Sequence, residues 1–175
     1  MKTALGLAAL AALAVAAAAA QEIPGASMRN HDSSAPIDFD AGRIEVREAE
    51  SQAIISGDVH VTQGSLDLDA ERIRVFYNDG ADRIQVDRLD ADGGVTVRTP
   101  AETARAQSAL YDVPGEQITM IGDVVLTRGS DVLRGQRLII DLGSGRSTFD
   151  AAVNAESGEG GRVTGSFTPS NVTNP

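Results

Sequence analysis

Apolar and polar residues alternate along most of the chain that follows Pro36. Gly, Asp and Asn residues separate the alternating runs, which is the pattern of half-buried antiparallel strands. No stretch beyond residue 20 keeps the period of a long amphipathic helix. The pattern therefore predicts an all-β protein. The alternating apolar pairs are Ile37/Phe39, Ile44/Val46, Val59/Val61, Leu66/Leu68, Ile73/Val75, Ile84/Val86, Val95/Val97 and Leu138/Ile140.

The alternating runs form a repeat. Each full copy begins with glycine, shows two apolar residues spaced by two, breaks at Gly or Pro, and continues with a second alternating stretch. We expect the glycine at the head of a copy, and the Asp that often follows it, to form a turn at a strand end. Copies of this kind stack into a repeated β layer. The copies are residues 57–75, 93–111 and 122–140, with breaks at Gly64, Pro100 and Gly129, and a truncated copy at 37–46.

Within a copy the apolar phase slips by one residue. Leu66 and Leu68 occupy even positions, whereas Ile73 and Val75 occupy odd ones. Such a slip would turn the apolar side chains to the wrong face of a strand, so we predict a bulge or bend that absorbs the extra residue. A small side chain relieves crowding where a strand bends. The small residues beside the slips are Ala41, Ala70, Ala106 and Gly135.

The apolar residues are mostly small or branched, since the chain has 4 Phe, 2 Tyr and no Trp. Facing sheets pack about 10 Å apart when large side chains interdigitate. Val, Ile, Leu and Ala need not fill that space. The composition therefore suggests a slot between two sheets rather than a solid core.

The N-terminal segment has the composition of a secretory signal peptide. Lys2 precedes an apolar run from Ala4 to Ala20, and small residues precede Gln21. We expect residues 1–20 to be removed by cleavage after Ala20; an uncleaved membrane anchor is the alternative.

The rest of the chain is expected to divide into a flexible lead over 21–35, one domain over 36–169 and a flexible tail over 170–175. A chain exported without cysteine depends on burial for its stability, and the periplasm fits better than an extracellular location.

The charge balance argues against nucleic acid as a partner. The chain carries 25 acidic residues against 15 Lys and Arg, a formal net charge of −10 at pH 7. Such a surface repels phosphate backbones at long range.

Residues suited to catalysis are sparse. Alternation points His60 away from the apolar face, and His31 falls in the expected flexible lead. Asp67, Asp69 and Glu71 alternate with apolar or small residues, as on a solvated strand face. The sequence contains no common hydrolase, zinc or phosphate-binding motif. We therefore expect no enzymatic activity, no catalytic residue, no metal site and no cofactor, and a polysaccharide-active enzyme is the weakest alternative.

Three stretches together resemble the OstA-like domain of the LptA family of lipopolysaccharide (LPS) export proteins. They are GDVHVTQGSLDLDAERIRV (57–75), Tyr111-Asp112, and ITMIGDVVLTRGSDVLRGQRLIIDLGSGRS (118–147). The resemblance runs from about Pro36 to Pro169, and residues 161–169 look like the last strand of the family. It implies a β-jellyroll of two antiparallel sheets, stacked in a V shape with a slight twist.

The resemblance also implies a function and partners. A member of this family is a periplasmic protein that binds LPS through lipid A. It meets an LptC-like inner-membrane protein at its N-terminal edge and an LptD-like outer-membrane protein at its C-terminal edge, with head-to-tail copies of itself between them. An LptC-like anchored relay and a non-enzymatic β scaffold or adhesin module remain as alternatives.

The same resemblance, together with the alternation, gives a set of lipid-binding groove residues. Val97 stands where the family has an aromatic residue. Lipid phosphates are expected outside the groove, near Arg43, Arg72 or Arg98. The expected groove residues are Ile37, Phe39, Val59, Val61, Val95, Val97, Tyr111, Val113, Val124 and Leu126.

Overall fold

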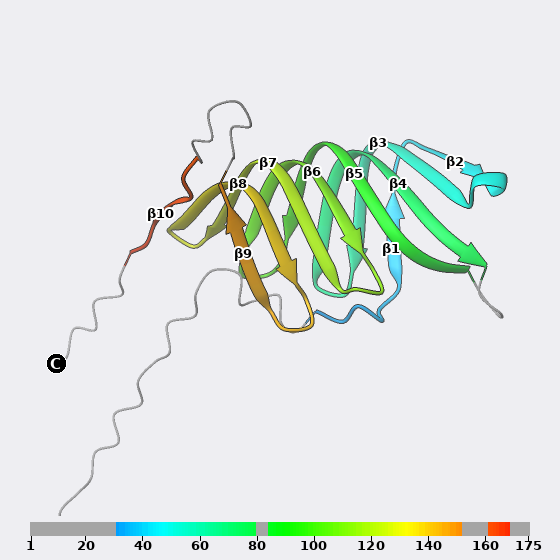
Figure 1. Cartoon of the computed structure of the whole chain (residues 1–175). Coiled ribbons are helices and arrows are strands. Elements are labelled where there is room, and N and C mark those ends of the chain that lie inside the picture. Colours follow the sequence, from blue (N-terminus) through cyan, green and yellow to red (C-terminus); the bar gives the residue numbers. More distant parts are fainter. Residues whose placement is uncertain (1–30, 80–83, 152–160, 169–175) are drawn as a thin grey trace, which may run out of the picture.

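The computed structural model describes residues 31–79, 84–151 and 161–168. The expected signal peptide, most of the expected lead and the expected tail lie outside these residues. The described part is built almost entirely of β-strands (Figure 1). The strands are β1 (Ile37–Asp40), β2 (Arg43–Arg47), β3 (Gln52–Gln63), β4 (Leu66–Asp79), β5 (Ile84–Arg98), β6 (Thr103–Asp112), β7 (Gln117–Arg128), β8 (Asp131–Asp141), β9 (Arg146–Asp150) and β10 (Thr164–Ser166), with one 3-10 turn, η2 (Glu48–Glu50).

All ten strands belong to one antiparallel sheet. Its order is β1-β3-β4-β5-β6-β7-β8-β10, while β2 also pairs with β3 and β9 also pairs with β8. Tight turns at two of the breaks expected from the sequence, Gly64 and Gly129, join β3 to β4 and β7 to β8. The predicted all-β class is confirmed, and so is the last strand expected within 161–169.

Each long strand bends near its middle, so the sheet folds over onto itself into two facing limbs (Figure 1). On each side of the bend, backbone hydrogen bonds join neighbouring strands within the same limb, and no strand pair among the described residues joins one limb to the other. This arrangement confirms the expected β-jellyroll, with the two layers formed by one continuous sheet. Limb A contains β1, 59–63, 66–70, 95–98, 103–106, 124–128, 131–135 and β10; limb B contains β2, 52–56, 72–79, 84–92, 108–112, 117–121, 137–141 and β9.

Glycine-led pairs produce the bends. Gly57 has φ +86 and Asp58 φ +48, and Gly122 and Asp123 repeat the pattern with φ +87 and +47. Each pair lies opposite a single residue of the next strand, because the register shifts between Ser56 and Val59 and between Ile121 and Val124. Two residues opposite one make a β-bulge. The expectation that these pairs form turns at strand ends was therefore wrong, since they lie inside β3 and β7.

The predicted phase slips do coincide with these bulges, and small residues lie beside them. Val59 pairs with Ala70, Val95 with Ala106 and Val124 with Gly135. A Cβ at Gly135 would lie 3.0 Å from both the Asp150 carbonyl oxygen and Phe149 Cδ1. The small residue is needed there because the end of β9 passes close to the bend.

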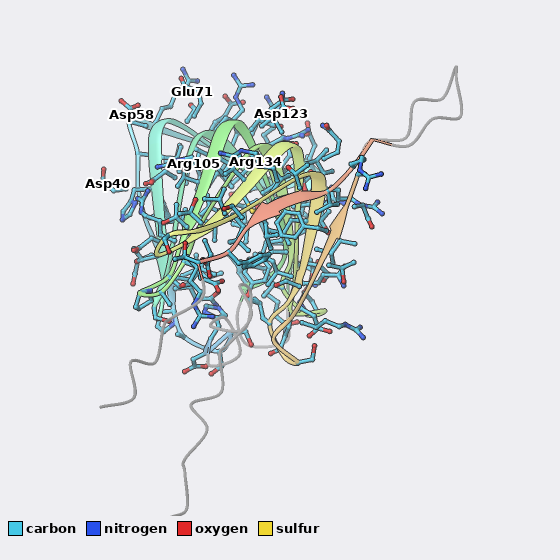
Figure 2. The ribbon with its side chains drawn as sticks, turned by 90° about the vertical axis from the view of Figure 1, so that its left-hand side faces the viewer. Asp40, Asp58, Glu71, Arg105, Asp123 and Arg134 are labelled. Carbon is cyan, nitrogen blue, oxygen red and sulfur yellow. The ribbon has the colours of Figure 1, made fainter. Side chains whose placement is uncertain are left out.

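The core lies between the limbs. It consists mainly of Val, Ile, Leu and Ala side chains from the inner faces of both, and Val97, Ile118 and Leu138 are fully inaccessible to solvent. Figure 2 views the molecule along the stack, with Asp58, Glu71 and Asp123 on the ridge where the strands bend. The suggested open slot differs from this structure, because limbs with small side chains approach closely enough for them to pack directly.

Candidate functional site

The inner faces of the two limbs hold the residues expected to contact lipid, except Val113, which lies in the turn that follows β6. Most of them lie in the closed core, Ile37 and Val113 are partly buried against it, and Phe39 is 50% exposed. Register pairs such as Phe39 with Val61 and Val97 with Leu68 place them in continuous rows across the strands. The buried members are Val59, Val61, Val95, Val97, Tyr111, Val124 and Leu126.

The apolar inner surface reaches the solvent at the N-terminal end of the stack. Phe39 of limb A and Ile44 and Val46 of limb B are about half exposed, at 50%, 49% and 57%. Ile44 pairs with the buried Ile55, so it lies on the inner face of β2. Ile44 and Val46 were not among the expected groove residues, although their alternation with Arg43, Glu45 and Arg47 was the available signal.

The C-terminal end of the stack also exposes apolar side chains. Phe149 on β9 packs against the core, while Val163 and Phe167, on either side of β10, are 40% and 54% exposed. Gly165 pairs with Leu133, and a Cβ there would lie 2.7 Å from Leu133 Cδ2. A side chain at position 165 would therefore have to displace the end of Leu133 on β8. The family resemblance predicted the last strand within 161–169, but Phe149, Val163 and Phe167 were not among the expected groove residues, because short, isolated strands give a weak pattern.

Both ends of the sheet terminate in strands that are paired on one side within the described residues. These are β1 and β2 at one end, which both pair with β3, and β9 and β10 at the other, which both pair with β8. An unpaired strand edge presents free N–H and C=O groups that can pair with another chain. In the part of the chain that the structure describes, the apolar interior therefore has an open edge at each end.

Polar groups close the side of the fold opposite the bend ridge, where the hairpin ends of the two limbs face each other. We call this side the mouth. Gln63 of limb A is 3% exposed, and its Oε1 accepts a hydrogen bond of 3.2 Å from the Tyr111 hydroxyl of limb B. Burial, with the nearby Glu116 charge, raises the pKa of Tyr111 to about 12. The phenol therefore keeps its proton at physiological pH and serves as the donor.

The outer faces carry most of the charge. His60 Nδ1 lies 2.7 Å from Asp69 Oδ1, and Arg98 also pairs with Asp69. Partial burial would raise the pKa of Asp69, but the hydrogen bonds from His60 and Arg98 outweigh it and hold that pKa below its usual value. His60 thus lies on the outer face, as alternation predicted, within a cross-strand ion pair network.

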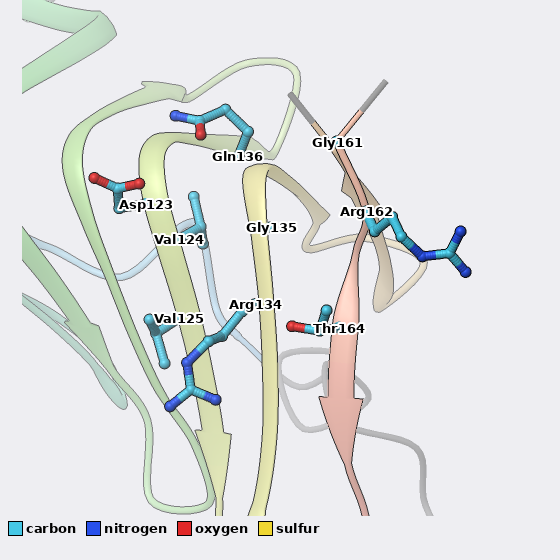
Figure 3. A pocket seen from close by; sticks show the side chains of 9 residues that line it. All are labelled: Asp123, Val124, Val125, Arg134, Gly135, Gln136, Gly161, Arg162 and Thr164. Carbon is cyan, nitrogen blue, oxygen red and sulfur yellow. The ribbon is translucent and has the colours of Figure 1, made fainter. Parts of the chain in front are cut away.

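Other hollows lie on the outside of the fold. Arg43 and Arg72, expected near lipid phosphates, line one hollow on limb B together with Glu45 and Asp92. Another lies where residues 161–164 run beside the bend of β7 and β8, and Figure 3 shows the Arg134 and Arg162 side chains pointing away from each other there.

The described residues hold no group of three or more His, Asp or Glu placed to bind a metal. None of the helices in that part is long and apolar enough to cross a membrane.

Comparisons with known proteins agree with this architecture. An uncharacterized protein of Rhizobium meliloti (strain 1021) is 29% identical over 165 residues, which cover 91% of this chain and 83% of that protein. The crystal structure of LptH, the LptA homologous periplasmic component of the LPS transport device from Pseudomonas aeruginosa, matches with a TM-score of 0.68 at 17% identity. That match covers 79% of this chain and 99% of the LptH chain, and it shows the same fold.

A family model gives the assignment. The model described as "LptA/(LptD N-terminal domain) LPS transport protein" matches residues 38–146, which run from β1 into β9 and include both limbs. The resemblance found in the glycine-led repeats is thereby confirmed. The chain belongs to the LptA/LptD N-terminal domain family of LPS transport proteins.

Proposed function

We propose that this protein carries LPS through the periplasm by holding the acyl chains of lipid A between its two limbs. Copies join head to tail, with an LptC-like inner-membrane protein at the β1/β2 end and an LptD-like outer-membrane protein at the β9/β10 end. The observation that carries this proposal is the apolar inner surface, which runs from one open sheet edge to the other.

The physical need for such a surface is large. Each methylene group exposed to water costs roughly 0.8 kcal/mol. A lipid with several acyl chains therefore cannot cross an aqueous compartment unshielded. The inner faces of the limbs offer Val, Ile and Leu side chains in place of water, and this requires no chemistry beyond burial.

Lipid entry requires the limbs to separate, because the core is closed in this structure. The backbone pairs of the sheet join residues of the same limb, so separation breaks none of these pairs. The bulges at Gly57, Gly93 and Gly122 provide a continuous line of flexure along the ridge. Acyl chains would then replace the contacts that the limbs make with each other.

The two ends support head-to-tail assembly. Strand addition to an open edge supplies main-chain hydrogen bonds, and alternate side chains supply specificity. A head-to-tail contact need not close on itself, so it can extend as a filament. Joining β1 and β2 of one copy to β10 and β9 of the next would cover Phe39, Ile44 and Val46 and make the apolar interior continuous.

Lipid binding is tested by photocrosslinking in the chain isolated from the periplasm of a Gram-negative host. A photoreactive residue at Val97 or Tyr111 should yield a crosslinked adduct detected with an antibody against lipid A. The same residue at Thr96, the outward-facing neighbour of Val97, should yield little. Equal labelling at positions 96 and 97, or none at 97 and 111, would contradict the proposal.

Assembly is tested by placing charge on the N-terminal edge. The double change Ile44→Lys and Val46→Lys should weaken self-association about 100-fold, since burying each apolar side chain is worth ~1.5 kcal/mol or more. Sedimentation velocity over a range of concentrations measures this. Ile121→Lys is the control, because Ile121 is 47% exposed on the outer face of β7, away from both ends.

The same preparation separates the alternatives. N-terminal sequencing that begins at Gln21 would exclude an LptC-like anchored relay, whereas a retained leader would favour it. A β scaffold or adhesin module would give neither lipid adducts nor concentration-dependent oligomers.

A further inference from the structure

Residues 31–35, which we call the strap, cross the mouth of the fold between the two limbs. In Figure 1 this segment runs beneath the hairpin ends on the lower side of the molecule before it enters β1. The sequence placed it in a flexible lead, yet it makes defined side-chain and backbone contacts with both limbs. It contains its own short turn, in which the Ala35 N–H donates to the Asp32 carbonyl oxygen at 3.1 Å.

Gln63 anchors the strap to limb A. Its Nε2 donates to the Ser33 carbonyl oxygen at 2.8 Å and to the Ala35 carbonyl oxygen at 3.1 Å. His31 Nε2 lies 3.1 Å from Gln63 Oε1. The same Oε1 accepts a hydrogen bond from the Tyr111 hydroxyl, so the buried amide of Gln63 connects limb A, limb B and the strap.

The strap also has an anchor on limb B. The Ser33 hydroxyl donates to Glu116 Oε1, in the turn between β6 and β7. Glu116 is itself fixed there, because its N–H donates to the Val113 carbonyl oxygen and its carbonyl oxygen accepts from the Leu142 N–H at 2.8 Å. The strap therefore bridges two elements that must move apart if the limbs separate.

We propose that the strap is a latch that holds the mouth closed while the interior is empty and is released when a lipid enters. This rests on the proposed function, in which acyl chains lie between the limbs. A polar headgroup attached to those chains cannot follow them into the apolar core, so it must remain at the mouth. Lipid and strap then compete for the same space, and the strap lowers the apparent affinity in proportion to the fraction of time it is bound.

Fixing the strap in place tests this directly. The chain contains no native cysteine, so Ser33→Cys with Glu116→Cys gives a single pair that a short bis-maleimide can bridge. Bridging should reduce LPS binding at least about tenfold relative to the unbridged double variant, because the open fraction sets the apparent affinity. The control is Thr62→Cys with Asp67→Cys, a register pair within limb A, whose bridging should leave binding unchanged. Equal LPS binding by the bridged and unbridged strap variants would overturn the latch.

A lipid-independent measurement tests the latch separately from the proposed function. Gln63→Leu replaces the buried amide with an apolar side chain of similar size. Because the hydrogen bonds of Gln63 to the strap are lost, the backbone amides of a peptide covering residues 31–36 should exchange hydrogen faster. Binding of the apolar dye N-phenyl-1-naphthylamine should rise about tenfold, since the loss of buried hydrogen bonds makes the open mouth more populated. Gln117→Leu on the exposed start of β7 is the control.

The two measurements give distinguishable failures. If wild-type protein and every unbridged variant fail to bind LPS, the proposed function is wrong. If Gln63→Leu leaves dye uptake and hydrogen exchange at the wild-type level, the latch proposal is wrong, whether or not the protein binds LPS. A change in uptake without LPS binding would keep the latch and reject LPS as the ligand.

Discussion

Val124→Asp is expected to lower the free energy of unfolding by about 4 kcal/mol, the cost of an uncompensated charge in a protein core. Val124 is inaccessible to solvent on the inner face of β7, where it pairs with Gly135 of β8. The facing limb offers apolar side chains, so a carboxylate there would lack both water and a cation. Domains of this size are stable by roughly 5–15 kcal/mol in total. Urea unfolding followed by circular dichroism would measure the loss.

The adjacent residue supplies the control. Val125 points to the outer face, and its register partners on the neighbouring strands are Arg105 and Arg134. Val125→Asp adds the same charge between two cations, so its effect should stay within about 1 kcal/mol and can be favourable. Similar losses for the two variants would mean that the limbs are not closed over Val124 in solution.

Gly93→Ala is expected to cost about 3 kcal/mol or more, combining backbone strain with a steric clash. Gly93 has φ +88, and an added Cβ would lie 2.4 Å from the Cβ of Glu71 on β4. Two Cβ atoms cannot approach that closely, so β4 and β5 would have to move apart at the bend. Thermal and urea unfolding both report the change.

Gly94→Ala separates the two contributions. Gly94 has nearly the same backbone conformation, φ +86, but an added Cβ there meets nothing within 4 Å. Its cost should be limited to the left-handed backbone strain, about 1–2 kcal/mol. If both variants lose the same stability, close packing of β4 against β5 is not what requires glycine at position 93.

The alternation determined the inside and outside of the sheet. Strict period two assigns each side chain of a strand to one face, so the residue pattern alone places Val95 and Val97 on the apolar face and His60 on the solvent face. The slips in phase also located the bends, because a strand cannot change face without an extra residue. The family followed from the order of these same local features, in particular the glycine-led repeats.

Other features required the tertiary structure because they depend on approach between distant segments. A Gly-Asp pair suits a turn and a bulge equally well by its local conformation, and only the neighbouring strands decide between them. The distance between the limbs depends on how all the inner side chains pack together, so composition alone suggested a slot where the structure has a closed core. Whether the inward residues contact lipid remains a prediction.

The sequence by itself therefore determined the strand class, the faces, the bend positions and the family, since each is recorded in neighbouring residues. Only the tertiary structure decided that Gln63 meets Tyr111 and that residues 31–35 cross the mouth. Those contacts join segments with no shared pattern, and they form because folding the sheet over brings its hairpin ends together. The same folding leaves apolar side chains exposed at both ends of the sheet, which are the surfaces proposed to join one copy to the next.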